Sequence, residues 1–316
     1  MKKWKKSLAA VVVLFAVVAL FLAGGAMYKQ DIYDAAMSME RDRAGLEAKR
    51  MKIGKYRIAW LESKKGEGRE TLVLVHGFGA MKENWLRFAG HLAEDYHVIA
   101  VDLPGHGESS KELTHDYGIE SQADFLFRFA NTLKLESFHL AGNSMGGAIS
   151  VVFAVAHPEL VKSLVLYDPA GVFDVVSPFI TLLEEGKNPL IANSEEEFDS
   201  LIHFVMEKPP FIPWPVSEVA AEKVIANAEI NRLVFSRISS KTGIDFKSLL
   251  KQLKVPVFVV WGAEDQVINA GNADIFVELI PNSSKLIYPG IGHLPMLEIP
   301  KQAATDFRRF VSGIEK

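Results

Sequence analysis

The sequence predicts an α/β protein with a mostly parallel central sheet, a helical cap insertion and an N-terminal transmembrane helix. Three observations lead to this prediction. Short, continuous apolar runs alternate with longer stretches of helical periodicity. One interval of roughly 75 residues contains no such run, which is too long for a bare loop. An uncharged stretch near the N-terminus has the length of a membrane span.

The composition is that of a folded chain without a nucleic-acid surface. The chain has 316 residues, of which 49% are hydrophobic and 23% charged, and this excludes disorder for most of its length. Lys and Arg number 35 against 39 Asp and Glu, and no basic cluster follows the N-terminus, so nucleic acid is not an expected partner. Because cysteine is absent, disulfides, thiolate nucleophiles, cysteine-type metal sites and a lipoprotein anchor are excluded.

The N-terminal segment, residues 1–28, is predicted to anchor the protein in a membrane. Four lysines precede the uncharged residues 7–28. As a helix this stretch is roughly 33 Å long, enough for a hydrocarbon layer of about 30 Å. Because positive flanks stay in the cytoplasm, the rest of the chain is expected on the outer side. The alternative is a signal peptide cleaved near the small residues 23–26, which would release a secreted protein.

Residues 29–50 are polar and helix-prone, and they are interpreted as a linker or stalk helix that is solvated or lies on the main domain. An alternative is a helix that lies in the membrane interface, with Tyr28, Ile32 and Met39 as its apolar edge.

The main domain is predicted to alternate strands with helices. A pair of short strands over residues 53–62 turns at Gly54. Buried strands of the parallel type are expected at 72–75, 97–101, 138–141, 163–167, 257–261 and 285–288. Helices are expected at 85–94, 118–133, 145–156, 246–253 and 270–279. This alternation is typical of a doubly wound sheet.

The strand-free interval, residues 173–248, is predicted to form a helical cap or lid. It contains helical stretches and a proline-rich piece at residues 208–215. The core of the domain is then made of two parts, residues 51–172 and 249–316.

A candidate nucleophile lies between a predicted strand and a predicted helix. Gly142-Asn143-Ser144-Met145-Gly146 fits the G-x-S-x-G pattern of a nucleophile elbow. The two glycines permit the tight turn that exposes a serine hydroxyl above the sheet. Ser144 is therefore the predicted nucleophile.

A serine nucleophile needs a general base. Among nine histidines only His293 follows the last predicted strand, in a loop that can reach the strand ends. His76 and His106 are interpreted as structural residues that hold loops by hydrogen bonds. His293 is the predicted base.

The base in turn needs an orienting acid, for which three residues are candidates. Asp265 and Glu264 follow the predicted strand 257–261, and Asp168 follows the strand 163–167. All three lie at the carboxyl ends of strands, where open α/β sheets place their sites. Asp265 is preferred, and geometry alone does not exclude Asp168.

An oxyanion hole is expected from two backbone N–H groups. Met145, directly after the nucleophile, supplies one, and Phe78 in the glycine-containing loop 76–80 supplies the other. As a phosphate-binding loop this segment lacks the Lys-Ser/Thr ending of a Walker motif.

Together these motifs resemble the α/β-hydrolase superfamily over residues 51–316. The loop at 76–85 and the N-terminal segment are similar to those of membrane-bound monoacylglycerol lipases and related bacterial lipases and esterases. The resemblance implies the α/β-hydrolase fold, the triad and oxyanion hole named above, and no metal or cofactor. The motifs that carry it are 76–85 (HGFGAMKENW), 102–109 (DLPGHGES), 142–147 (GNSMGG), 261–265 (WGAED) and Gly292-His293 with Glu298 and Pro300.

The predicted function is hydrolysis of lipid esters, above all of monoacylglycerol to glycerol and fatty acid. Apolar cap residues are expected to bind the acyl chain, although they also pack the cap onto the core: Phe179, Phe204, Met206, Phe211 and Trp214.

Three alternatives stay open. A small-ester carboxylesterase and a C–C bond hydrolase of this fold use the same serine triad. A non-catalytic binding protein is the third, although no member of the triad is missing. A serine at the elbow disfavours relatives that use a carboxylate nucleophile there, such as dehalogenases and epoxide hydrolases. The sequence gives no indication of the oligomeric state.

Overall fold

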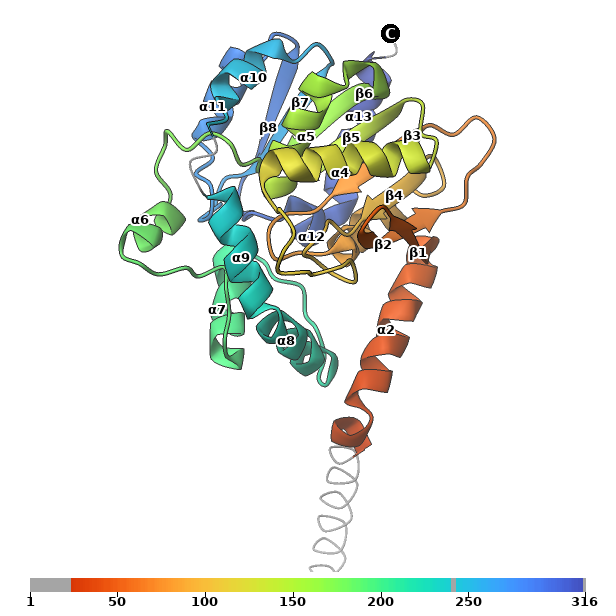
Figure 1. Cartoon of the computed structure of the whole chain (residues 1–316), viewed down its shortest axis with the longest axis vertical. Coiled ribbons are helices and arrows are strands. Elements are labelled where there is room, and N and C mark those ends of the chain that lie inside the picture. Colours follow the sequence, from red (N-terminus) through yellow and green to blue (C-terminus); the bar gives the residue numbers. More distant parts are fainter. Residues whose placement is uncertain (1–23, 240–242, 315–316) are drawn as a thin grey trace, which may run out of the picture.

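Eight strands form one twisted sheet in the computed structural model, which describes residues 24–239 and 243–314 (Figure 1). Their order in the sheet is β1-β2-β4-β3-β5-β6-β7-β8. The strands are β1 (Leu46–Ile53), β2 (Tyr56–Ser63), β3 (Thr71–Val75), β4 (His97–Val101), β5 (Phe138–Asn143), β6 (Val161–Tyr167), β7 (Val257–Gly262) and β8 (Ser283–Tyr288).

Helices cover both faces of this sheet (Figure 1). One face packs against α4 and α5, the other against α3 and α13. The α-helices are α2 (Lys29–Ala44), α3 (Leu86–Gly90), α4 (Ile119–Thr132), α5 (Met145–Ala156), α6 (Pro178–Glu184), α7 (Glu195–Val205), α8 (Val216–Ala226), α9 (Ala228–Ile238), α10 (Phe246–Gln252), α11 (Asn272–Leu279), α12 (Pro295–Glu298) and α13 (Pro300–Ile314). Short 3-10 helices occupy η1 (Lys82–Trp85) and η2 (Pro158–Leu160).

The predicted mostly parallel sheet is confirmed. Strands β3 to β8 pair in parallel, and only the hairpin β1–β2 and the β2–β4 pair are antiparallel. The central strands β3, β4, β5 and β7 are almost wholly buried, which is why their sequences read as continuous apolar runs.

The prediction for residues 29–50 was wrong in one respect, because the helix ends earlier and a strand follows it. Gly45, with φ 67°, closes α2 in a left-handed cap, and β1 begins at Leu46. The strand pairs with β2 along its whole length, from Leu46 opposite Ser63 to Ile53 opposite Tyr56. These cross-strand bonds outweigh the helical propensity of the charged segment. Helix α2 itself packs against α3 and α8.

The predicted helix at residues 85–94 is shorter than expected and is preceded by η1. The other four predicted helices agree with the structure to within one or two residues at each end, and α5 agrees at both.

Five helices, α6 to α10, lie between β6 and β7 in the chain, and the first four of them, α6 to α9, lie beyond one end of the sheet (Figure 1). They contact the loops that follow the strands. The backbone N–H of His293 donates to the carbonyl of Val205 at 2.9 Å, and that of Phe179 donates to Gln266 at 3.0 Å. The helices therefore cover the edge of the sheet at which the candidate side chains lie.

Most of the apolar stretch at residues 7–28 lies outside the described residues, as do the lysines before it. Within residues 24–239 and 243–314, no helix combines the length and the apolar character needed to cross a membrane.

Candidate active site

Ser144 lies in a strained turn between β5 and α5. Its φ is 54°, in the left-handed region that non-glycine residues rarely adopt. The turn depends on glycine on both sides: a Cβ on Gly142 would lie 2.3 Å from the carbonyl oxygen of Gly146, and a Cβ on Gly146 would lie 2.4 Å from that of Val75. This is the local geometry that the G-x-S-x-G pattern predicts.

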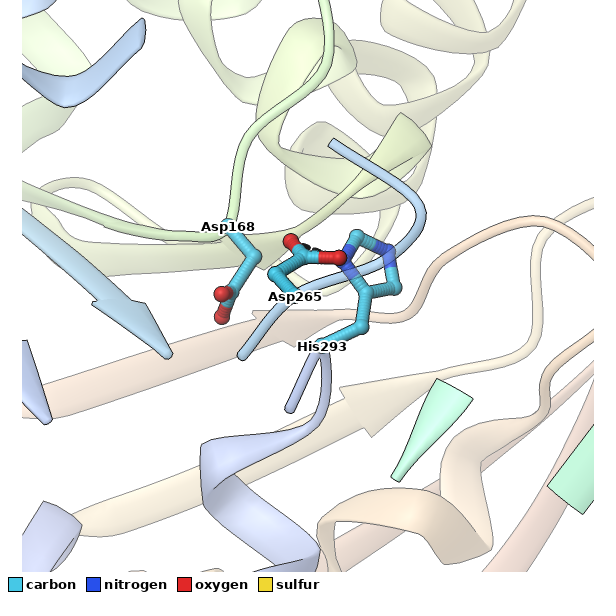
Figure 2. Close-up of side chains that lie close together, drawn as sticks. All are labelled: Asp168, Asp265 and His293. Atoms are coloured by element: carbon cyan, nitrogen blue, oxygen red, sulfur yellow. Dashed lines mark hydrogen bonds and ion pairs between the residues drawn. The ribbon is translucent and has the colours of Figure 1, made fainter. Parts of the chain in front are cut away.

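Asp265 and His293 meet in a short hydrogen bond, although 28 positions separate them in the chain (Figure 2). The Nδ1 atom of His293 and the Oδ2 atom of Asp265 are 2.7 Å apart, and both side chains are buried. Asp265 accepts further hydrogen bonds from the indole of Trp261 and from the backbone N–H groups of Val267 and Ile268. Four donors therefore surround the carboxylate of Asp265. When Nδ1 of His293 donates to Asp265, Nε2 is the ring nitrogen left to accept a proton.

Asp168 lies beside this pair (Figure 2). One carboxylate oxygen of Asp168, one of Asp265 and one ring nitrogen of His293 lie within 4.8 Å of one another. Oδ1 of Asp168 accepts a hydrogen bond from the backbone N–H of Gly262, while Oδ2 has no partner within the described residues. Burial, and then the charge of Asp265, raises the pKa of Asp168 well above its ordinary value. Both effects favour the protonated form of the Asp168 carboxyl.

Of the three acid candidates, Asp265 alone is hydrogen-bonded to His293. Glu264 is exposed. The oxygen and nitrogen atoms of Asp168, Asp265 and His293 are also of the types that bind metal ions. Their hydrogen bonds fit another role, because both oxygens of Asp265 and the Nδ1 of His293 are already engaged.

Sequence reasoning missed Asn143, which precedes Ser144 in the chain. Its buried side-chain amide donates to the backbone carbonyls of His293 and Tyr167, each at 3.1 Å. It thereby connects the end of β5 with the loop that carries His293. The only sequence signal for Asn143 was its place directly before the serine of the G-x-S-x-G pattern. That pattern accepts any residue at this position, so it gave no reason to select Asn143.

The loop at residues 76–80 lies against Ser144. A Cβ on Gly77 would lie 3.1 Å from the Cβ of Ser144. The ring of Phe78 packs against His106 and against Phe235 of the cap, and Met145 is buried at the first position of α5. Both expected oxyanion donors thus belong to segments next to Ser144.

His76 and His106 hold loops, as their place in the sequence suggested. The backbone N–H of Leu103 donates to Nε2 of His76 at 3.0 Å, so the Nδ1–H of His76 donates to the carbonyl of Gly77. Burial lowers the pKa of His76 to about 4 and that of His106 to about 3. Both imidazoles are therefore neutral at neutral pH.

The five cap residues expected to bind substrate fall into two groups. Phe179 and Met206 are buried, and Phe204 packs against the core. Phe211 is 87% exposed, and the indole of Trp214 donates to Glu218 at the outer side of the cap. Two surface hollows, of about 560 and 360 Å³, are lined by residues of α13 and of the β1–β2 hairpin with Glu108, and contain none of these side chains.

Comparison with known proteins decides the family. A profile described as the alpha/beta hydrolase fold matches residues 70–190. Lipase 3 of Moraxella sp. (strain TA144) is 37% identical over 282 residues, which cover 88% of either chain. This chain belongs to the α/β-hydrolase family. The hydrolase is also 28% identical to mouse (Mus musculus) monoacylglycerol lipase ABHD6 over 257 residues, 78% of its own length and 76% of the relative's.

A solved structure gives the same assignment. The crystal structure of a membrane phospholipase A, described as a novel bacterial virulence factor, has a TM-score of 0.89 and 36% identity, and 99% of either chain is covered. The predicted α/β-hydrolase fold is confirmed, and this hydrolase is a carboxylic ester hydrolase of the lipase and esterase type.

Proposed function

We propose that this hydrolase cleaves monoacylglycerol to glycerol and a fatty acid, with Ser144, Asp265 and His293 as its catalytic triad. The 2.7 Å hydrogen bond between Asp265 and His293, in a chain whose relatives are lipases, is the observation that carries the proposal. The named relatives are lipases, which supports a lipid ester as the substrate. Monoacylglycerol is proposed in particular because the ABHD6 relatives are named monoacylglycerol lipases.

The proposed reaction proceeds through an acyl-enzyme. Nε2 of His293 takes the proton of Ser144 Oγ while that oxygen attacks the ester carbonyl. The backbone N–H groups of Phe78 and Met145 donate to the oxyanion of the tetrahedral intermediate. His293 then gives the proton to the departing glycerol oxygen. A water molecule, deprotonated by His293, releases the fatty acid in the same way. Asp265 stays ionised and stabilises the imidazolium at each stage.

The cap supplies the proposed acyl-chain contacts. Phe179, Phe204 and Met206 lie on its inner side, where an alkyl chain would replace water against apolar surface. Phe211 and Trp214 are exposed, so we propose that they contact the substrate on the solvent side of the cap.

Residues 7–28 are proposed to anchor the hydrolase in a membrane, with the catalytic domain on the outer side. Their uncharged sequence after four lysines supports this proposal. The likeness to a structure described as a membrane phospholipase A also supports membrane association.

A phospholipid is the second candidate substrate. The solved structure that matches over 99% of either chain is called a membrane phospholipase A, and the ester bond of a phospholipid acyl chain needs the same triad.

Initial rates of the full-length protein in lipid nanodiscs test the proposal. The substrates are a long-chain monoacylglycerol, a diacyl phospholipid and a short-chain aryl ester, with Ser144→Ala as the blank. We expect monoacylglycerol to lead by tenfold or more, about 1.4 kcal/mol in transition-state stabilisation. A lead by phospholipid would favour the second candidate. Turnover of the aryl ester alone would contradict both and favour a small-ester carboxylesterase or a C–C bond hydrolase.

A further inference from the structure

A fully buried lysine lies two residues after the loop of residues 76–80. Lys82 is the first residue of η1, and its side chain is 0% exposed. Lysine is almost never buried completely unless its charge is paired, because removing an ammonium group from water is costly. The reaction proposed above does not use this residue.

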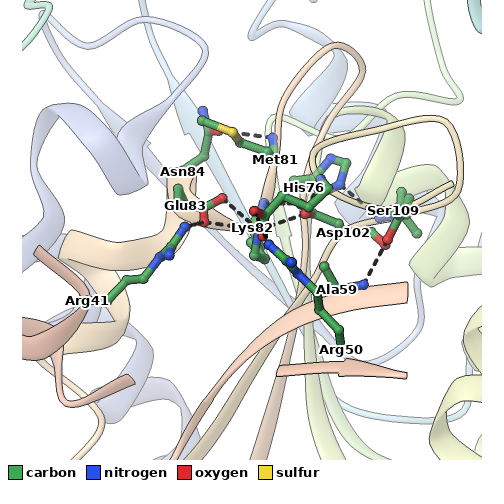
Figure 3. Close-up of polar contacts among 12 residues, drawn as sticks. Arg41, Arg50, Ala59, His76, Met81, Lys82, Glu83, Asn84, Asp102 and Ser109 are labelled. Atoms are coloured by element: carbon green, nitrogen blue, oxygen red, sulfur yellow. Dashed lines mark hydrogen bonds and ion pairs between the residues drawn. The ribbon is translucent and has the colours of Figure 1, made fainter. Parts of the chain in front are cut away.

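Three carboxylates surround the Lys82 ammonium group (Figure 3). Its Nζ atom lies 2.8 Å from Oδ2 of Asp102, 2.9 Å from Oε2 of Glu108 and 3.0 Å from Oε1 of Glu83. Burial lowers the pKa of Lys82, but Asp102 and Glu83 more than offset this, so the pKa is raised overall. The ammonium group therefore stays charged.

Asp102 connects the segment that carries Lys82 with the segment of residues 102–108. It follows β4 and is also fully buried. Its Oδ1 atom accepts from the backbone N–H of Lys82 at 2.7 Å, and its Oδ2 atom accepts from the backbone N–H of Glu108 at 2.8 Å. One carboxylate thus binds both the backbone and the side chain of Lys82.

The same two segments also meet at the start of the loop, where Leu103 donates to the imidazole of His76. The loop is therefore bound to residues 102–108 at both ends, by a neutral histidine at one end and by a charged lysine at the other. Between these two ends lies Phe78, the proposed oxyanion donor. Gly77, its neighbour, is in close contact with Ser144.

We propose that Lys82 is a positioning residue for ester hydrolysis, which holds the loop of residues 76–80 so that the backbone N–H of Phe78 points at the oxyanion. The inference rests on the proposed role of Phe78. An ammonium group suits this task because its three N–H donors bind carboxylates from two separate segments at once. An apolar side chain of the same volume would fill the space without fixing the direction of the loop.

The paired carboxylates extend this network to the surface. Arg41 of α2 donates to Glu83 at 2.5 Å, and Arg50 of β1 donates to Glu108 at 2.6 Å (Figure 3). The positions of Glu83 and Glu108, and through them that of Lys82, therefore depend on the N-terminal helix and on the first strand as well.

A positioning role and a purely structural role predict different kinetics. Displacing an oxyanion donor weakens binding of the transition state and leaves substrate binding in the ground state unchanged, so kcat falls at constant KM. A loss of stability alone lowers the fraction of folded enzyme, and kcat per active site stays the same.

The test uses full-length Lys82→Met and the paired variant Lys82→Met/Asp102→Asn, which removes the buried cation together with its main partner. Active sites are counted from the end point of fluorophosphonate labelling, and rates are measured on a short-chain aryl ester. We expect kcat per active site and the labelling rate to fall about 10- to 100-fold, with KM within about threefold of the wild type.

Asp306→Asn is the matched control. Asp306 is a buried carboxylate of α13 that binds Tyr288 and Arg309, apart from the oxyanion loop. We expect it to lower the unfolding temperature and to leave kcat per active site unchanged. Unchanged kcat in the Lys82 variants, with a similar fall in unfolding temperature, would overturn the inference.

Glu108→Gln keeps the test decisive if both Lys82 variants fail to fold, because the Glu108 side chain is 37% exposed. A fall in kcat of about threefold or more at constant KM supports the inference, and an unchanged kcat overturns it. Because the assay uses an aryl ester, a wild-type enzyme that ignores monoacylglycerol contradicts the proposed substrate and leaves this test intact.

Discussion

The side-chain amide of Asn143 donates a hydrogen bond to the backbone carbonyl of His293 at 3.1 Å. The same amide donates to the carbonyl of Tyr167, so one side chain connects the ends of β5 and β6 with the loop after β8. Asn143 is the neighbour of Ser144 in the chain. The residue that binds the loop of the proposed base is therefore adjacent to the proposed nucleophile. The base is therefore positioned from two sides, by Asn143 at its backbone and by Asp265 at its ring.

Asn143→Ala should impair catalysis more than it impairs folding. The change removes the side-chain donor of the His293 carbonyl and one of two donors of the Tyr167 carbonyl, which still accepts from the backbone N–H of Ser144. Such a loss costs about 1–3 kcal/mol of folding free energy. It also frees the loop that carries His293, and we expect kcat to fall roughly 10- to 100-fold. Steady-state kinetics and thermal unfolding measure both effects. Asn227→Ala, which removes an amide at the exposed end of α8, is the control and should leave kcat unchanged.

Asp265→Asn and Asp168→Asn should separate the two buried acids of the site. Asparagine at 265 cannot hold His293 in the required tautomer, and we expect kcat to fall about 10³- to 10⁴-fold. Burial raises the pKa of Asp168 and favours its neutral form, which asparagine resembles, so asparagine there should change kcat less than about threefold. Steady-state rates of both variants and the wild type on one ester at pH 8 measure these two effects. A larger loss from the change at 168 would make Asp168 the orienting acid.

Gly146→Ala should prevent the elbow from forming. The added methyl group would lie 2.4 Å from the backbone oxygen of Val75, which cannot move without breaking the pairing of β3. We expect a loss of about 3 kcal/mol or more in the free energy of unfolding, measured in urea. Gly313→Ala, in the last turn of α13, meets no atom within 4 Å and should stabilise the protein by up to about 1 kcal/mol. Equal stability of the two variants would contradict the steric account.

Glu62→Gln should reduce stability at neutral pH but not in strong acid. The hydrogen bond from His97, together with those from Trp60 and Lys49, lowers the pKa of Glu62 from 4.5 to about 2. Because the unfolded chain binds the proton more readily, the stabilisation is complete above pH 4.5 and is lost as the pH falls to about 2.

The lowered pKa of Glu62 corresponds to at most about 3.5 kcal/mol of stability, since one pKa unit is about 1.4 kcal/mol. Urea unfolding at pH 6 and at pH 2.5 should show a gap between variant and wild type that narrows in acid. Glu47→Gln is the matched control, because Glu47 lies directly opposite Glu62 in the hairpin and is exposed. A gap that stays constant with pH would rule out this role of Glu62.

The strands and the elbow could be predicted because their signals are local. Buried parallel strands must be apolar along their whole length, and the turn around Ser144 has room only for glycine on either side. The predicted strand pair turns at Gly54 as the structure does, but it begins at residue 53, whereas β1 begins at Leu46. The earlier part of β1 was missed because this strand has one exposed face and many charges, so that its periodicity resembles that of a polar helix. Its pairing with β2 is a contact between segments, which no local pattern of residues 46–53 reports.

By itself, the sequence determined the α/β sheet, the serine at the elbow, His293 as the histidine beyond the last strand, and the helical insertion. Each of these follows from the order of residues along the chain. Only the tertiary structure decided between Asp265 and Asp168 as the partner of His293, because both follow neighbouring strands and differ only in which carboxylate meets Nδ1. The roles of Asn143 and Lys82 likewise depend on distances between remote segments, since a hydrogen bond forms only where the folded chain brings donor and acceptor together.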